Sequence, residues 1–152
     1  MKSMLLMENI TKKFVQGKQE INALKQINLD VKQGEFISII GPSGSGKSTF
    51  LTISGGLQQP TSGEIKINDI SFTHLSEKER AKLRFKEIGF ILQSSNLIPF
   101  LTIQEQFFLV DKINKEKMKS ADIENLLKSL DIYDLKDKYP RDLSGGERQR
   151  VA

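Results

Sequence analysis

The 152-residue chain contains no cysteine and no tryptophan. Without cysteine, neither a disulfide framework nor a thiolate metal site can form. No apolar run approaches the roughly 18 residues of a membrane-spanning helix, and the apolar part of residues 1–7 is too short for a signal peptide. The 23 basic and 19 acidic residues are interspersed, so no block of like charge points to nucleic acid. The composition predicts one globular domain whose role at a membrane, if it has one, requires a partner.

A glycine-rich stretch dominates what the chain does contain. It fits the phosphate-binding pattern G-x-x-x-x-G-K-S/T and reads Gly41-Pro42-Ser43-Gly44-Ser45-Gly46-Lys47-Ser48-Thr49. We predict a short buried strand at residues 36–40 and a helix from Lys47 to about Leu57. Glycines let the backbone approach a phosphate, while successive N–H groups and the helix N-terminus attract its charge. Lys47 is then placed to reach the β- and γ-phosphates, and the Ser48 hydroxyl to bind Mg²⁺.

Apolar periodicity and helix caps predict the other elements. Strands are expected at 4–10, 23–31, 64–67, 70–72 and 88–92, the last ending at Gln93. A helix with leucines and isoleucine at helical spacing is expected to begin at Ser120. Three further helices are expected from the capping boxes Ser76/Glu79, Thr102/Glu105 and Ser144/Glu147.

The other informative stretch is Leu143-Ser144-Gly145-Gly146-Glu147-Arg148-Gln149-Arg150-Val151-Ala152. Taken alone, it describes a capped helix that follows a turn. Together with the phosphate loop about 100 residues upstream, it closely resembles the signature motif of ATP-binding cassette (ABC) ATPases. Residues 53–57 and 60–63 match the family's linking pattern. Residues 88–93 and 96–102 resemble the subgroup of lipoprotein-release, macrolide-export and antimicrobial-peptide-resistance ATPases.

The resemblance implies an α/β fold, namely a P-loop NTPase with an ABC-type nucleotide-binding domain. Its antiparallel β subdomain is expected near residues 1–33 and 63–73. We expect residues 1–93 to form the P-loop core plus β subdomain, and residues 94–152 the α-helical subdomain with the signature. In this family a strand ending in Asp-Glu, a loop Asp and a switch His follow the signature helix. Since the sequence stops before them, the resemblance implies a C-terminally incomplete domain that binds nucleotide without turnover.

The resemblance also assigns roles to residues. ATP would sit between two such domains, with Phe14 stacked on the adenine and Lys47 on the phosphates. Ser48 and Gln93 would hold Mg²⁺. The candidate catalytic residues are Lys47, which would contact the phosphates, and Gln93. The second copy would close over the γ-phosphate with Ser144, Gly145, Gly146 and Glu147.

The family implies ATP hydrolysis that drives a transmembrane permease, docked near residues 94–100 on the cytoplasmic face of the cell membrane. The permease would set the substrate. One alternative is a soluble ABC ATPase of the DNA-repair or translation kind. The span between Gln93 and Ser144 leaves no room for the long coiled-coil insertion of the repair type. The other alternative is a nucleotide-binding fragment without turnover.

Two features look like the missing catalytic parts. The run Phe107–Asp111 matches an apolar strand that ends in Asp, but Lys112 follows where Glu is needed. The cap at Thr102 predicts a helix there instead. His74 precedes a helix cap, and we expect an ordinary surface histidine rather than the switch His.

Overall fold

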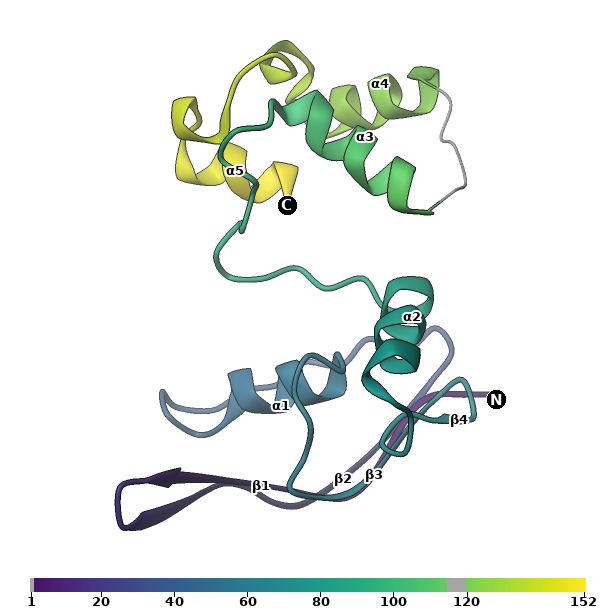
Figure 1. Cartoon of the computed structure of the whole chain (residues 1–152), viewed down its shortest axis with the longest axis vertical. Helices are drawn as coiled ribbons and strands as arrows, with labels where there is room; N and C mark the ends of the chain where they lie inside the picture. Colours follow the sequence, from purple (N-terminus) through teal and green to yellow (C-terminus); the bar gives the residue numbers. More distant parts are fainter. Residues whose placement is uncertain (1, 115–119) are drawn as a thin grey trace. The chain divides into compact units, whose positions relative to one another are not determined.

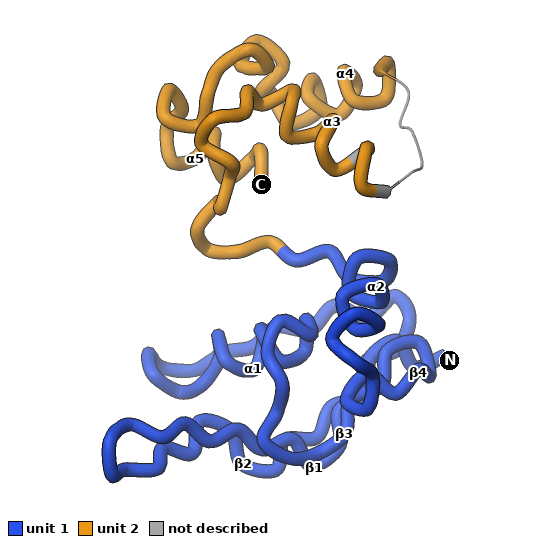
Figure 2. The backbone as a smooth tube through the Cα atoms, in the orientation of Figure 1, with its two compact units in different colours: residues 1–90 blue, residues 91–152 orange. Residues whose placement is uncertain are grey.

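The computed structural model describes residues 2–114 and 120–152, which form two compact units, residues 1–90 and 91–152 (Figure 2). Helices and strands are labelled in Figure 1. None of the helices in the described ranges is long and apolar enough to cross a membrane. Each unit has its own apolar core.

The first unit is built on an antiparallel sheet with the strand order β2-β1-β3-β4. Its strands are β1 (Ser3–Gln16), β2 (Gln19–Lys32), β3 (Ser62–Ile67) and β4 (Ile70–Ser71). This confirms the expected antiparallel β subdomain. The hairpin of β1 and β2 is longer than the predicted strands. Its tip is largely exposed and lacks apolar alternation, so the sequence pattern did not predict the outer part of the two strands. Gly17, with φ 62°, supplies the tight turn.

Two helices complete the first unit, α1 (Lys47–Ser54) and α2 (Glu77–Glu87). The buried side chains of α1, Phe50 and Ile53, belong to one core with the inward-facing residues of the sheet. This core comprises Met7, Ile10, Leu24, Phe50, Ile53, Ile65, Ile67, Phe72 and Leu83. The α1 helix ends earlier than predicted, since Gly56 has φ +67° and a Cβ there would lie 2.5 Å from the Phe72 ring.

The predicted buried strand at residues 36–40 is wrong for this structure. The segment has no regular secondary structure, and Phe36 and Ile40 are 94% and 91% exposed. A strand requires a hydrogen-bonded neighbour, and none of the described residues pairs with it. Residues 88–92 are also not a strand, and Ile91 is 72% exposed. The apolar composition of residues 36–40 and 88–92 predicted buried strands. A strand also needs a neighbouring strand to pair with, and composition does not show whether one is present.

The second unit is helical. It contains α3 (Ile103–Asn114), α4 (Ser120–Ser129), the 3₁₀ turns η1 (Tyr133–Leu135) and η2 (Pro140–Asp142), and α5 (Gly145–Val151). The described run at 107–111 lies within α3, so the helical prediction is confirmed. The α3 cap is present as predicted, with Thr102 N–H donating to Glu105 Oε2 over 2.7 Å. The core consists of Ile103, Ile123, Leu127, Ile132, Leu143 and Val151.

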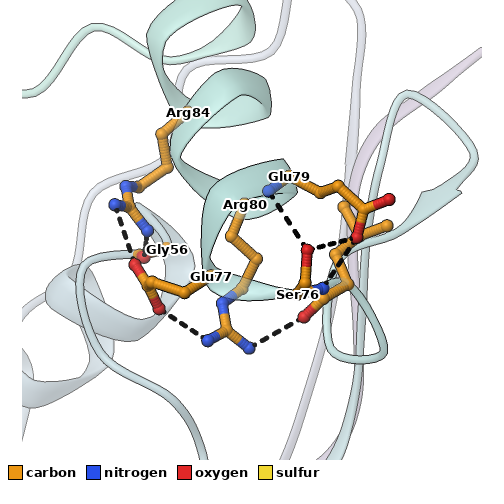
Figure 3. A network of polar contacts seen from close by, with 7 residues as sticks. Gly56, Ser76, Glu77, Glu79, Arg80 and Arg84 are labelled. Atoms are coloured by element: carbon orange, nitrogen blue, oxygen red, sulfur yellow. Dashed lines mark hydrogen bonds and ion pairs between the residues drawn. The ribbon is translucent and has the colours of Figure 1, made fainter.

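The capping box of α2 belongs to a polar network that ties this helix to the end of α1 (Figure 3). The guanidinium of Arg84 donates to the Gly56 carbonyl over 3.0 Å. Arg80, which is buried, donates to Glu77 over 2.6 Å and to the Leu75 carbonyl over 3.1 Å. Hydrogen bonds from Arg80 and then Arg84 lower the pKa of Glu77 below its usual value. The network therefore fixes the C-terminal end of the helix whose N-terminus follows the phosphate loop.

Candidate functional site

The phosphate loop has glycines at the positions where its backbone adopts a left-handed conformation. Gly44 and Gly46 have φ values of +78° and +92°, and Gly46 is the N-cap of α1. A Cβ at Gly46 would lie 2.6 Å from the carbonyl oxygen of Ala23 in β2, which leaves no space for a side chain. The loop is thus pressed against β2, and a glycine is needed at 46 for both conformation and space.

A cavity of about 490 Å³ lies at this loop. It is lined by residues 21–23 of β2 and residues 43–49 of the loop and α1. The first turn of α1 carries no acidic residue, and the cavity lining has no Asp or Glu. The helix N-terminus therefore offers its N–H groups and positive dipole end to an anion without competition from a nearby carboxylate.

Lys47 is held in place by the loop itself. Its Nζ donates to the carbonyl oxygens of Gly41 and Pro42, each over 2.7 Å. An ammonium group has three donors, so one remains for a phosphate oxygen. The loop carbonyls thereby position the positive charge at the cavity lined by Lys47 and Ser48.

Ser48 lies in the first turn of α1, is exposed, and lines the same cavity. Its hydroxyl is an oxygen donor of the kind that Mg²⁺ prefers. Within residues 2–114 and 120–152, no group of three or more His, Cys, Asp or Glu side chains is arranged to hold a metal ion. The donor set thus fits a magnesium ion that takes most of its ligands from nucleotide phosphates and water.

Phe14 lies in β1 directly opposite Ile21 of β2. Opposite residues of antiparallel strands share one face, and Ile21 lines the cavity. Phe14 is 38% exposed, and the ammonium of Lys12 lies 5.3 Å from the centroid of its ring. An accessible ring therefore lies one strand away from the phosphate loop, where a base could stack on it.

Gln93 belongs to the second unit, whereas Lys47 and Ser48 belong to the first. It is exposed and lies in a segment without regular secondary structure. Since Gln93 and Ser48 lie in different units, their shared metal role stays a prediction. The Nε2 of Gln149 donates to the carbonyl of Leu92 over 3.2 Å. Sequence reasoning missed this contact, because a hydrogen bond across 57 positions leaves no local pattern.

The signature residues form the N-terminus of α5. The Ser144 N–H donates to Glu147 Oε2 over 2.6 Å, and the Glu147 N–H donates to Ser144 Oγ over 3.3 Å. This confirms the third capping box. The side-chain hydrogen bond from Ser144 lowers the pKa of Glu147. Gly145 and Gly146 are exposed, and a Cβ at either would have no neighbour within 4 Å. The packing of the described residues therefore does not require glycine at these two positions.

Comparison with known proteins finds a match to the family described as "ABC transporter" over residues 24–152. The chain is 42% identical, over 98% of its length, to the ABC transporter ATP-binding protein MJ0796 of Methanocaldococcus jannaschii. It is 46% identical, over 97% of its length, to a Staphylococcus aureus protein named as the hemin import ATP-binding protein HrtA. The chain spans 66% of the length of MJ0796 and 67% of that of HrtA.

Solved structures show the same similarity. A dimeric structure of MJ0796 matches 97% of the chain, and 66% of its own length, with a TM-score of 0.88 at 41% identity. A dimeric post-hydrolysis state of MJ0796 that holds ADP and phosphate matches with a TM-score of 0.89 over the same shares. The cbiO1 protein of Clostridium perfringens, part of the cbiONQ transporter complex, matches with a TM-score of 0.74 at 29% identity, over 99% of the chain and 59% of cbiO1.

Proposed function

Because the chain belongs to the ABC transporter family and has the fold of its ATP-binding cassette, we propose that it is the nucleotide-binding part of a subunit that couples ATP to transport. The observation that carries this proposal is the position of Lys47. Two loop carbonyls hold its ammonium beside a 490 Å³ cavity, and one donor is left for a phosphate.

In the proposed complex, the N–H groups of residues 43–49 and the Lys47 ammonium bind the β- and γ-phosphates. Ser48 and Gln93 supply oxygen ligands for Mg²⁺, which would neutralise phosphate charge when bound. Phe14 stacks on the adenine, a contact supported by its exposed ring beside Ile21.

Hydrolysis belongs to the proposed activity of the whole protein, of which the chain covers about two thirds by comparison with MJ0796. Phosphoryl transfer to water needs a group that orients the water. The cavity at the phosphate loop is lined by no carboxylate that could do so. We therefore propose that residues 1–152 alone bind nucleotide with little or no turnover.

We propose that two copies act together, as the dimeric MJ0796 structures suggest. The signature residues of one copy would face the phosphate loop of the other. This arrangement is supported by the exposure of Ser144, Gly145 and Gly146 at the start of α5, where a facing phosphate could reach them.

A membrane permease is the proposed partner, by analogy with HrtA and cbiO1. With such a partner, the protein would act at the cytoplasmic face of the cell membrane. The loop 94–100 supports a docking role, since Phe100 is 76% exposed. Leu97 and Ile98 are only partly exposed, and Leu97 packs against the second core. Of these three apolar residues of the loop, Phe100 is thus the most accessible.

Isothermal titration of ATP into the purified chain tests the nucleotide site. Lys47→Ala should weaken binding sharply, because it removes a charge-assisted contact to phosphate. Lys86→Ala is the matched control, since this lysine lies on α2 with its side chain 81% exposed. Equal ATP affinity in the unaltered chain and in Lys47→Ala would contradict the proposed site.

A further inference from the structure

Few of the described hydrogen bonds reach the segment that carries Gln93. Residues 91–95 form neither helix nor strand. In the two described ranges, one hydrogen bond reaches the backbone of this segment, from Gln149 Nε2 to the Leu92 carbonyl over 3.2 Å. The distance is at the long end of the ordinary range. The backbone immediately before Gln93 therefore depends on a side chain of α5.

The α5 helix itself is firmly fixed within the second unit. Its N-terminus is closed by the Ser144/Glu147 capping box. Arg148, the neighbour of Gln149, donates to the Leu143 carbonyl over 2.9 Å and to the Pro140 carbonyl over 3.4 Å. Val151 is buried in the second core. Two consecutive side chains of α5 thus hold two stretches of backbone. Arg148 holds residues 140–143, and Gln149 holds Leu92.

We propose that Gln149 is a positioning residue that ties the signature helix to Gln93. Any displacement of α5, for instance when Ser144 meets a phosphate, is transmitted through this amide to Leu92 and so to the next side chain, Gln93. The inference rests on the proposed function for the metal role of Gln93. The tether itself is a property of the second unit and can be measured without nucleotide.

The tether is tested by nuclear magnetic resonance on the ¹⁵N-labelled 152-residue chain. Gln149→Leu removes the donor and keeps much of the side-chain length, Gln149→Lys restores a donor, and Arg150→Leu is the control on the same helix. Gln149→Leu should lower the order parameters of the amides at 92–94 toward the flexible range, below about 0.6. Gln149→Lys should recover the original values, and Arg150→Leu should leave them unchanged. Unchanged values in Gln149→Leu, or an equal drop in Arg150→Leu, would overturn the tether.

The functional consequence is measured with a fluorescent ATP analogue, titrated with and without Mg²⁺. Loss of a hydrogen bond of ordinary strength corresponds to about a fivefold change in population. Gln149→Leu should therefore reduce the Mg²⁺-dependent gain in affinity about fivefold, leave the Mg²⁺-free affinity unchanged, and be rescued by Gln149→Lys. A parallel fall of both affinities would mean a general structural defect and would overturn the positioning role. If the unaltered chain binds no nucleotide, the proposed function fails, and the order parameters still decide the tether.

Discussion

The Nζ atom of Lys47 lies 2.7 Å from the carbonyl oxygen of Pro42 and at the same distance from that of Gly41. The loop thereby holds the ammonium group of its own lysine. Two short contacts to fixed carbonyls specify a compact donor with tetrahedral geometry. These contacts therefore favour an ammonium group at position 47 over another group of the same charge.

This contact predicts that Lys47→Arg does not preserve the site. The guanidinium keeps the charge, but it is planar and larger, so it does not fit the position that the ammonium takes beside the two carbonyls. We expect ATP affinity to fall at least about tenfold, the equivalent of one charge-assisted hydrogen bond. Calorimetric titration measures the change. Retention of the original affinity in Lys47→Arg would show that the carbonyl contacts do not matter for binding.

The glycine at position 46 predicts a difference between two Gly→Ala substitutions. Gly46→Ala combines a left-handed backbone with a Cβ 2.6 Å from the Ala23 carbonyl, so we expect a loss of at least about 1–2 kcal/mol in the free energy of unfolding. Gly145→Ala adds a Cβ that has no neighbour within 4 Å and should be close to neutral. Urea denaturation compares the two variants. Equal midpoints would indicate that the loop does not press against β2.

Phe14 should tolerate another aromatic residue but not alanine. Phe14→Ala is expected to weaken ATP binding by about 1–3 kcal/mol, the range of one base stacked on an aromatic ring. Phe14→Trp keeps a stacking surface and should bind ATP nearly as well as the unaltered chain. A large loss of affinity in Phe14→Trp would argue that the ring contacts protein rather than base.

Residues 1–152 should release little phosphate from Mg²⁺-ATP. The cavity at the loop has no acidic lining residue, and general-base assistance is worth typically 10²–10⁴-fold in rate. A phosphate-release assay compares the chain with Lys47→Ala. Turnover that disappears in Lys47→Ala would demonstrate hydrolysis at this site and contradict the prediction.

The Glu77 contacts with Arg80 and Arg84 predict that stability falls in acid. The folded-state pKa of Glu77 is lowered from 4.5, by hydrogen bonds from Arg80 and then Arg84. A lowered pKa adds stability that is fully present above about pH 4.5 and is lost as the pH falls through the lower value of the folded state. Urea midpoints of the unaltered chain and Glu77→Gln should therefore differ at pH 7, and the difference should shrink as the pH falls below about 4.5. A difference that does not shrink in acid would contradict the role of the ionised carboxylate.

The sequence by itself determined the features that depend on near neighbours in the chain. The phosphate loop and the capping boxes are examples, since Ser76 and Glu79, or Ser144 and Glu147, are three residues apart and satisfy each other's backbone. The folded conformation of these pieces follows from local hydrogen bonds and from glycine φ angles.

The tertiary structure alone decided which segments acquire partners. Residues 36–40 have the apolar composition of a buried strand, yet Phe36 and Ile40 are exposed because no described strand pairs with them. The contact of Gln149 with Leu92 joins residues 57 positions apart, and nothing in the local sequence of either predicts it. Strand pairing and long-range hydrogen bonds depend on where distant parts of the chain meet, and that is a property of the whole fold.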